Sequence, residues 1–265
     1  MLPAKKTVSS VMSELMSNPA VKSRFNEILG KRSNKFVSAL ISLINADQNL
    51  TNAFVENPMS VLQVAMKAAT YDLEIGNDLG FAYIIPFRVN GKPSAQFILG
   101  YRGLIQLAKR SNELVKIGAS VVREGELKKI DRLYGDCEFE WIQDESERLK
   151  KNVIGYVASI KERSGFEKMI FMTKQDMIDY EEKNRKGQFQ SPVWKNHFDS
   201  MACKTVLRKL LGTYGSLSAK SDSDDDIARE VVNNDDLDSE SIDIDISSQQ
   251  QNMNNDDQES NEIRE

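Results

Sequence analysis

Few residues of this chain have the types and spacing that covalent chemistry requires. The only histidine, His197, has no cysteine or serine nucleophile paired with it in a local catalytic pattern, and a lone histidine on a helix is most often structural. Cys137 and Cys203 with one histidine lack the ligand spacing of a usual zinc site. No phosphate-binding loop of the form G-x-x-x-x-G-K-S/T occurs. We therefore expect neither a zinc site nor an intrinsic nucleotide motor.

One triplet, Glu126-Leu127-Lys128, has the form of the E-x-K half of a metal-dependent nuclease site. Such a site also needs an upstream carboxylate on a neighbouring strand. No aspartate occurs between Asp78 and Asp131 to supply it. A nuclease is therefore a poor alternative, and we expect the chain to act by binding and not as an enzyme.

Basic and aromatic residues between positions 81 and 111 could bind a polyanion without any covalent step. Two strands joined by Asn90-Gly91, a dipeptide that favours a tight hairpin turn, are followed by the corner G-Y-R-G (100–103) and a helix. At about 100° per residue, cations share one face of this helix and apolar residues turn toward a core. The cationic face holds Arg102, Gln106, Lys109 and Arg110, the apolar face holds Leu104, Ile105 and Ala108, and the hairpin tip holds Phe87, Arg88 and Lys92. These groups suit base stacking and phosphate neutralisation, although a solvated helix and an ordinary hairpin fit equally well.

A second cationic face is predicted on a long helix that begins at Pro192 and reaches about Leu211. Helical spacing gathers one apolar, buried arc from Ala202, Cys203, Val206, Leu207 and Leu210. The opposite, outward face holds Trp194, Met201, Lys204, Thr205 and Arg208. The alternative is that the tryptophan and methionine pack on a neighbour while the two cations are merely solvated. We favour nucleic-acid binding, because this is the second such face in one basic body.

Charge is distributed very unevenly along the chain. Residues 221–265 contain 16 of the 40 acidic residues and two of the 35 basic ones, so this segment carries −14 and residues 1–220 carry +9. A basic body suggests a polyanionic partner. Two cysteines make no disulfide framework, and no apolar run approaches the roughly 20 residues of a membrane span. We expect a cytoplasmic protein.

The sequence predicts an α+β fold in three parts, and its helices and strands position these residues. Residues 1–75 read as a helical region, 76–220 as an α+β core and 221–265 as an acidic, disordered tail. The core is an antiparallel sheet of two hairpins plus additional strands, packed with helices and closed by the long C-terminal helix. Strands are expected at 114–124, 137–142, 153–161 and 166–172, and a helix at 173–184, the second hairpin turning at Ser164-Gly165.

The tail contains one patterned segment, I-D-I-D-I at 242–246. Alternating isoleucine and aspartate could be a short partner motif. Solubilisation by the acidic residues explains the composition equally well.

Four blocks in order resemble the RecT family of phage and prophage single-strand annealing proteins. They are L-G-F-A-Y-I-I-P-F (79–87), G-Y-R-G (100–103) with L-A-K-R-S (107–111), V-V-R-E-G-E (121–126), and Trp194 through Met201 to Lys204-Thr205 and Arg208. Together they cover most of residues 60–218. Two departures occur: Cys203 stands where a second lysine is common, and Tyr214-Gly215 replaces the usual Leu-Pro.

The resemblance implies an ATP-independent recombinase that coats single-stranded DNA, pairs it with a complementary strand and assembles into rings or helical filaments. It implies a core similar to those of the lambda Red beta protein and the eukaryotic annealing ring proteins. Partners would be single-stranded DNA, the annealed duplex, further copies of the chain, a phage exonuclease and a host single-strand DNA-binding protein. No cofactor would be required, with magnesium only as a DNA counterion.

On this interpretation the DNA-binding residues come from the two cationic faces and the hairpin tip, together with Arg123 of the predicted strand at 114–124. Backbone contacts are expected from Arg102, Lys109, Arg110, Arg123, Lys204 and Arg208, a hydroxyl donor from Thr205, an aromatic contact from Trp194, and base stacking or separation from Phe87, Arg88 and Lys92. Two other classes stay open: a sequence-reading DNA-binding regulator and a non-catalytic interaction scaffold. A regulator would normally offer a compact helix-turn-helix, which nothing here resembles.

Overall fold

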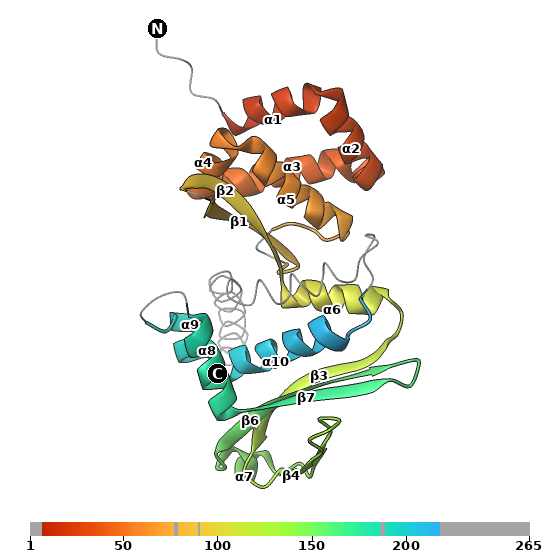
Figure 1. Cartoon of the computed structure of the whole chain (residues 1–265), viewed down its shortest axis with the longest axis vertical. Helices are drawn as coiled ribbons and strands as arrows, with labels where there is room; N and C mark the ends of the chain where they lie inside the picture. The colour runs from red at the N-terminus through yellow and green to blue at the C-terminus, as the bar shows by residue number, and fades with distance from the viewer. Residues whose placement is uncertain (1–6, 77–78, 90, 186–188, 218–265) are drawn as a thin grey trace, which may run out of the picture. The chain divides into compact units, whose positions relative to one another are not determined.

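The computed structural model describes residues 7–76, 79–89, 91–185 and 189–217, which form two compact units. The first runs to Gly103 and the second starts at Leu104. Both combine helices with antiparallel strands, so the predicted α+β class is confirmed (Figure 1). The predicted tail, residues 221–265, lies outside the described residues.

Helices fill the first unit up to Thr70, as predicted. They are α1 (Val8–Ser17), α2 (Pro19–Leu29), the 3₁₀ turn η1 (Gly30–Arg32), α3 (Ser33–Ala46), α4 (Gln48–Glu56) and α5 (Pro58–Thr70). Side-chain caps satisfy the orphan backbone N–H groups at the starts of α1, α2, α4 and α5. In α5, for example, the side chain of Asn57 accepts a hydrogen bond from the Ser60 N–H, and Pro58 is the first helical residue. This confirms the predicted helix start. Buried apolar residues from each of the five α-helices, such as Phe25, Leu40 and Phe54, form the core.

The first hairpin packs on these helices. Strands β1 (Ala82–Val89) and β2 (Lys92–Leu99) pair from Ala82 with Leu99 to Val89 with Lys92, which leaves a two-residue connection as predicted. Within that connection Gly91 has a φ of 78°, a conformation natural to glycine. The hairpin lies against α4 and α5, where the Ser60 hydroxyl bonds the Ser94 hydroxyl at 2.7 Å and accepts from the Ala95 N–H at 2.9 Å. The hairpin therefore groups with the helical region, and the division into units falls after it.

The G-Y-R-G corner is built for close backbone approach. The Gly100 N–H donates to the Phe81 carbonyl oxygen at 3.0 Å, which ties the start of helix α6 (Tyr101–Arg110) to the chain entering β1. A Cβ atom on Gly100 would lie 2.2 Å from the Gly80 carbonyl oxygen, and one on Gly103 would lie 2.2 Å from that of Phe81. Both glycines are thus needed for packing, whatever the corner does with DNA.

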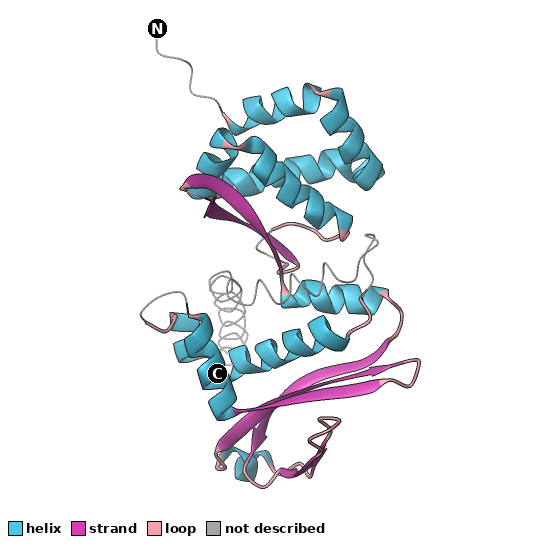
Figure 2. Ribbon diagram, in the orientation of Figure 1, coloured by secondary structure: helices cyan, strands magenta, loops and turns pink. Residues whose placement is uncertain are grey.

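The second unit is built on a three-stranded antiparallel sheet with the order β3-β6-β7. Its strands are β3 (Leu114–Arg123), β6 (Val153–Glu162) and β7 (Glu167–Thr173), and the predicted second hairpin turns at Gly165 with a φ of 90°. Helix α10 (Phe198–Tyr214) lies across one face of this sheet and contacts all three strands, with α8 (Lys174–Asn184) packed beside it on β6 and β7 (Figure 2).

A small ribbon completes the second unit. It consists of β4 (Leu127–Ile130) and β5 (Cys137–Phe139), followed by the short helix α7 (Glu145–Leu149). The Cys137 N–H approaches the sulfur of Met169 in β7 at 3.1 Å, which joins the ribbon to the main sheet. The strand expected at 137–142 corresponds to β5, which is shorter than predicted and ends at Phe139. Strand β4 was not predicted. None of the helices in the described part of the chain is long and apolar enough to span a bilayer.

Replacing Gly103 with alanine tests the corner. An alanine methyl group would collide with the backbone oxygen of Phe81, and such overpacking costs about 1–3 kcal/mol of unfolding free energy. Urea denaturation of Gly103→Ala should show that loss. Gly118→Ala is the matched control, because a Cβ atom at Gly118 meets no atom within 4 Å. Equal stability of Gly103→Ala and its parent would contradict the packing role.

Candidate nucleic-acid interface

The long C-terminal helix predicted from Pro192 is broken at His197. The structure has a short helix α9 (Pro192–Asn196), capped by the Ser191 hydroxyl, and then α10 from Phe198. His197 has a φ of −132°, outside the helical range, and its N–H donates to the Val193 carbonyl. The prediction of one continuous helix was wrong. A face drawn across the break therefore combines residues that do not share a side.

Trp194 belongs to the short helix and is buried. Its ring packs edge-on against Phe198 with 5.4 Å between ring centroids, and Phe198 in turn lies 6.3 Å from the ring of Tyr156 in β6. The outward position expected for Trp194 is thus wrong. Its aromatic ring holds α9 and α10 on the sheet.

The outward face predicted for α10 is also buried. Met201 and Arg208 are each 3% exposed and Thr205 is 8% exposed, although all three project away from the residues that face the sheet. The Thr205 hydroxyl donates to the Met201 carbonyl oxygen at 2.9 Å, so its polarity is satisfied inside the helix. Lys204 alone keeps partial exposure. Assigning Met201, Thr205 and Arg208 to a solvent face was wrong, because α10 is covered on both sides.

The hairpin tip is exposed as expected. Phe87 is 47% exposed, and Arg88 and Lys92 are also exposed, with Arg88 Nη1 donating to the Gly91 carbonyl oxygen at 3.1 Å. In the observed register Phe87, Val89 and Lys92 share one face of the ribbon, and Arg88 lies on the other. The tip therefore presents apolar and cationic groups together, and half-exposed Val89 joins the residues named from sequence.

Helix α6 has the predicted polarity in part. Leu104, Leu107 and Ala108 are buried, while Lys109 and Arg110 in its last turn are exposed. Arg102 is half-buried, and its Nε atom lies 3.4 Å from the Tyr101 hydroxyl. The exposed cations of this helix thus lie at its C-terminal end, where they also interact favourably with the helix dipole.

Two further cations, missed from sequence, lie beside this helix end. The Arg163 N–H in the β6–β7 turn donates to the carbonyl oxygen of Glu113, three residues after α6, at 2.8 Å. Lys116 follows on β3, opposite Lys161 of β6. We call the exposed residues Lys109, Arg110, Lys116 and Arg163 the basic corner. The basic corner could not be predicted from a local sequence pattern, because its residues come together only through the pairing of β3 with β6.

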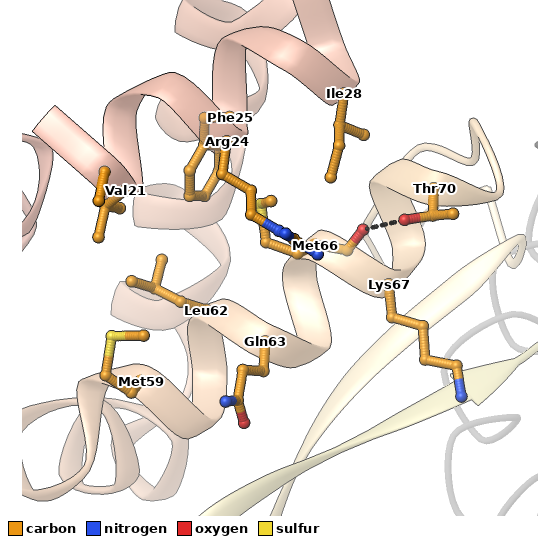
Figure 3. Close-up of a pocket in the computed structure, with 11 residues that line it drawn as sticks. Val21, Arg24, Phe25, Ile28, Met59, Leu62, Gln63, Met66, Lys67 and Thr70 are labelled. Atoms are coloured by element: carbon orange, nitrogen blue, oxygen red, sulfur yellow. Dashed lines mark hydrogen bonds between the residues drawn. The ribbon is translucent and has the colours of Figure 1, made fainter. Parts of the chain in front are cut away.

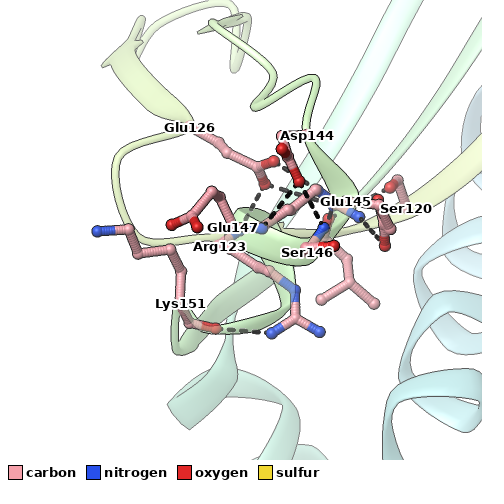
Figure 4. A network of polar contacts seen from close by, with 10 residues as sticks. Ser120, Arg123, Glu126, Asp144, Glu145, Ser146, Glu147 and Lys151 are labelled. Atoms are coloured by element: carbon pink, nitrogen blue, oxygen red, sulfur yellow. Dashed lines mark hydrogen bonds and ion pairs between the residues drawn. The ribbon is translucent and has the colours of Figure 1, made fainter.

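Arg123 has a structural task. It is half-buried at the end of β3, and its Nη1 atom donates to the Lys151 carbonyl oxygen at 2.6 Å (Figure 4). This bond fixes the start of β6 to the end of β3. A DNA contact by Arg123 stays a prediction.

The E-x-K triplet belongs to the same network. Glu126 is fully buried, its Oε1 atom accepts from Nε of Arg148 at 2.6 Å, and its Oε2 atom accepts from the Arg123 N–H at 2.8 Å (Figure 4). Burial alone would raise the pKa of Glu126, but these hydrogen bonds and the Arg148 charge together lower it. Lys128 pairs with Glu140 at 2.9 Å. Glu126 therefore serves as a structural carboxylate.

Comparison with known proteins gives one family and two relatives. The model of the RecT family matches residues 34–248. An uncharacterized protein of Bacillus subtilis (strain 168), YqaK, is 41% identical over 211 residues, which cover 80% of this chain and 69% of that protein. Protein RecT of Escherichia coli (strain K12) is 30% identical over 162 residues, covering 57% of this chain and 56% of that protein.

Truncating Arg208 tests the corrected assignment of α10. Because the side chain is buried, Arg208→Ala should lower the unfolding free energy by about 1–3 kcal/mol, through lost packing and polar contacts. The control Lys195→Ala removes an exposed cation from α9 and should change stability by less than about 0.5 kcal/mol. An Arg208→Ala variant with parental stability and weakened DNA binding would restore the outward face predicted from sequence.

Proposed function

The chain belongs to the RecT family, and from this premise we propose that it is an ATP-independent single-strand annealing protein of homologous recombination. The observation that carries the proposal is the family match over residues 34–248, which includes the hairpin, α6 and the whole β3-β6-β7 sheet. The exposed cations at the hairpin tip and the basic corner support it. They supply the charge that binding a phosphate backbone needs.

The proposed mechanism is physical. Two single strands repel each other through their phosphates, so an annealing protein must neutralise the backbone while leaving the base edges free to pair. Exposed lysines and arginines do this without making or breaking a bond. Once the register is found, stacking and pairing release about 1.4 kcal/mol per step, so no nucleotide has to be hydrolysed.

The residues divide into three roles in this proposal. The basic corner and Lys204 contact phosphates, and Phe87 with Arg88 and Lys92 at the hairpin tip stacks on or separates bases. Trp194, Thr205 and Arg208 act through the fold, because they are buried. Loss of any of these three would impair DNA binding by disturbing α9 and α10.

The assembly and the partners are part of the same proposal. Copies of the chain form a ring or helical filament on single-stranded DNA and hold the annealed duplex. An exonuclease would produce the single-stranded DNA, and a host single-strand DNA-binding protein would transfer that DNA to this chain. Neither ATP nor a bound metal takes part in the pairing, and magnesium acts only as a DNA counterion.

Annealing of complementary labelled oligonucleotides tests the function directly. Duplex formation, followed by fluorescence quenching without any nucleotide, should be faster than the spontaneous rate, because pairing is downhill and the protein removes only the repulsion. A strict requirement for ATP, or no acceleration at any protein concentration, would refute the proposal. Strong preference for one duplex sequence would favour a regulator, and failure to retain DNA at low salt would favour a scaffold.

The salt dependence of binding tests the basic corner. Removing two phosphate contacts with Lys109→Ala and Arg163→Ala should weaken binding at every sequence and flatten the log–log salt slope by about 1.4, at roughly 0.7 per contact on a single strand. The matched control is Lys128→Ala with Lys129→Ala, two exposed cations already paired with Glu140 and Glu138. If the control flattens the slope and the corner variant does not, the DNA runs over the β4–β5 ribbon instead.

A further inference from the structure

An apolar groove lies between α2 and α5 within the first unit (Figure 3). Its volume is about 550 Å³, in the range of sites that bind ligands or short peptide segments. Phe25 and Leu62 form a buried floor, and Met59 and Met66 line α5, with Met59 45% exposed. Methionines adapt to irregular apolar partners, so this lining suits a flexible segment.

The polar groups around the groove carry positive charge. Arg24 comes from α2 and Lys67 from α5, and none of the described residues that line the groove is acidic. The Lys67 Nζ atom lies 6.0 Å from the centroid of the Phe97 ring, which holds this cation at the hairpin side. The Thr70 hydroxyl donates to the Met66 carbonyl oxygen at 3.0 Å, so it does not need a partner in the groove (Figure 3). An occupant should combine apolar side chains with negative charge.

We propose that the groove binds the chain's own segment Ile242-Asp243-Ile244-Asp245-Ile246. In an extended conformation successive side chains point to opposite sides, so the isoleucines face one way and the aspartates the other. The isoleucines fill the apolar floor, and the aspartates lie near Arg24 and Lys67. No other part of the acidic segment alternates in this way, since residues 221–241 contain the adjacent pairs Ile227-Ala228 and Val231-Val232 and a single Leu237, and residues 247–265 contain only the single apolar residues Met253 and Ile263.

The segment is joined to the second unit by a long stretch of chain. Twenty-five peptide units separate Leu217, where the described residues end, from Ile242. Fully extended, they span roughly 80 Å. The experiments below separate docking within one chain from docking between copies.

Docking would have a consequence for charge. The docked aspartates would neutralise Arg24 and Lys67 beside the groove. DNA phosphates that approached these two cations would compete with the segment for them.

Methyl NMR of the full chain, labelled at the methionine methyl groups, tests docking without DNA. In the triple variant Ile242→Ser, Ile244→Ser, Ile246→Ser, the Met59 and Met66 resonances should shift from their wild-type positions. Met177 and Met201, buried in the second unit, serve as internal controls and should not move. Asp243→Asn with Asp245→Asn should shift the same two resonances in the same direction by a smaller amount.

Addition of unlabelled wild-type chain to the labelled triple variant separates docking within a chain from docking between copies. Return of the Met59 and Met66 resonances toward wild-type positions would show the segment of one copy in the groove of another, which also supports the proposal. Identical Met59 and Met66 resonances in wild type and triple variant would overturn it. So would shifts that follow dilution but not the isoleucine substitutions, since a second copy of the body would then cover the groove. The NMR experiment does not measure annealing, so the docking proposal and the proposed annealing function can each fail independently of the other.

Discussion

The burial of α10 on the β3-β6-β7 sheet is the constraint on which the second unit depends. Helix and sheet are joined by apolar contacts and by a part-buried polar link, in which the Tyr156 hydroxyl donates to Asp199 Oδ1 at 2.6 Å. Burial, with this hydrogen bond, raises the pKa of Tyr156, so the phenol stays a protonated donor. Burial also raises the pKa of the Cys203 thiol to about 11, which leaves this cysteine unreactive at neutral pH. A helix held in this way cannot offer a broad face to DNA.

Apart from Lys204, the exposed cations that the proposed function uses lie at the edges of the fold. The hairpin tip, the last turn of α6 and the β6–β7 turn are all places where the chain leaves a packed element and side chains reach solvent. At the C-terminal end of a helix such as α6, unpaired carbonyl groups and the helix dipole also interact favourably with cationic side chains. In the proposed function, buried residues such as Arg208 and Trp194 keep the framework rigid, and exposed residues such as Lys109 and Arg163 contact the phosphates.

Sequence reasoning succeeded where local chemistry decides the structure. The dipeptides Asn90-Gly91 and Ser164-Gly165 predicted both hairpins correctly, since Gly91 and Gly165 have the left-handed conformation that few other residues adopt. It failed for α10, because an apolar arc shows which side must be buried but not whether the other side is free. The break at His197 has neither proline nor glycine to mark it, and the basic corner depends on strand pairing between residues about 50 apart.

Covalent footprinting of lysines tests most directly whether DNA meets the edges of the fold. The protein, with and without single-stranded DNA, would be acylated briefly and the modification of each lysine measured by mass spectrometry. We predict that DNA protects Lys92, Lys109 and Lys116, while Lys128 and Lys129 on the ribbon react equally in both samples. Protection of the ribbon lysines with none at the hairpin tip or basic corner would contradict this account.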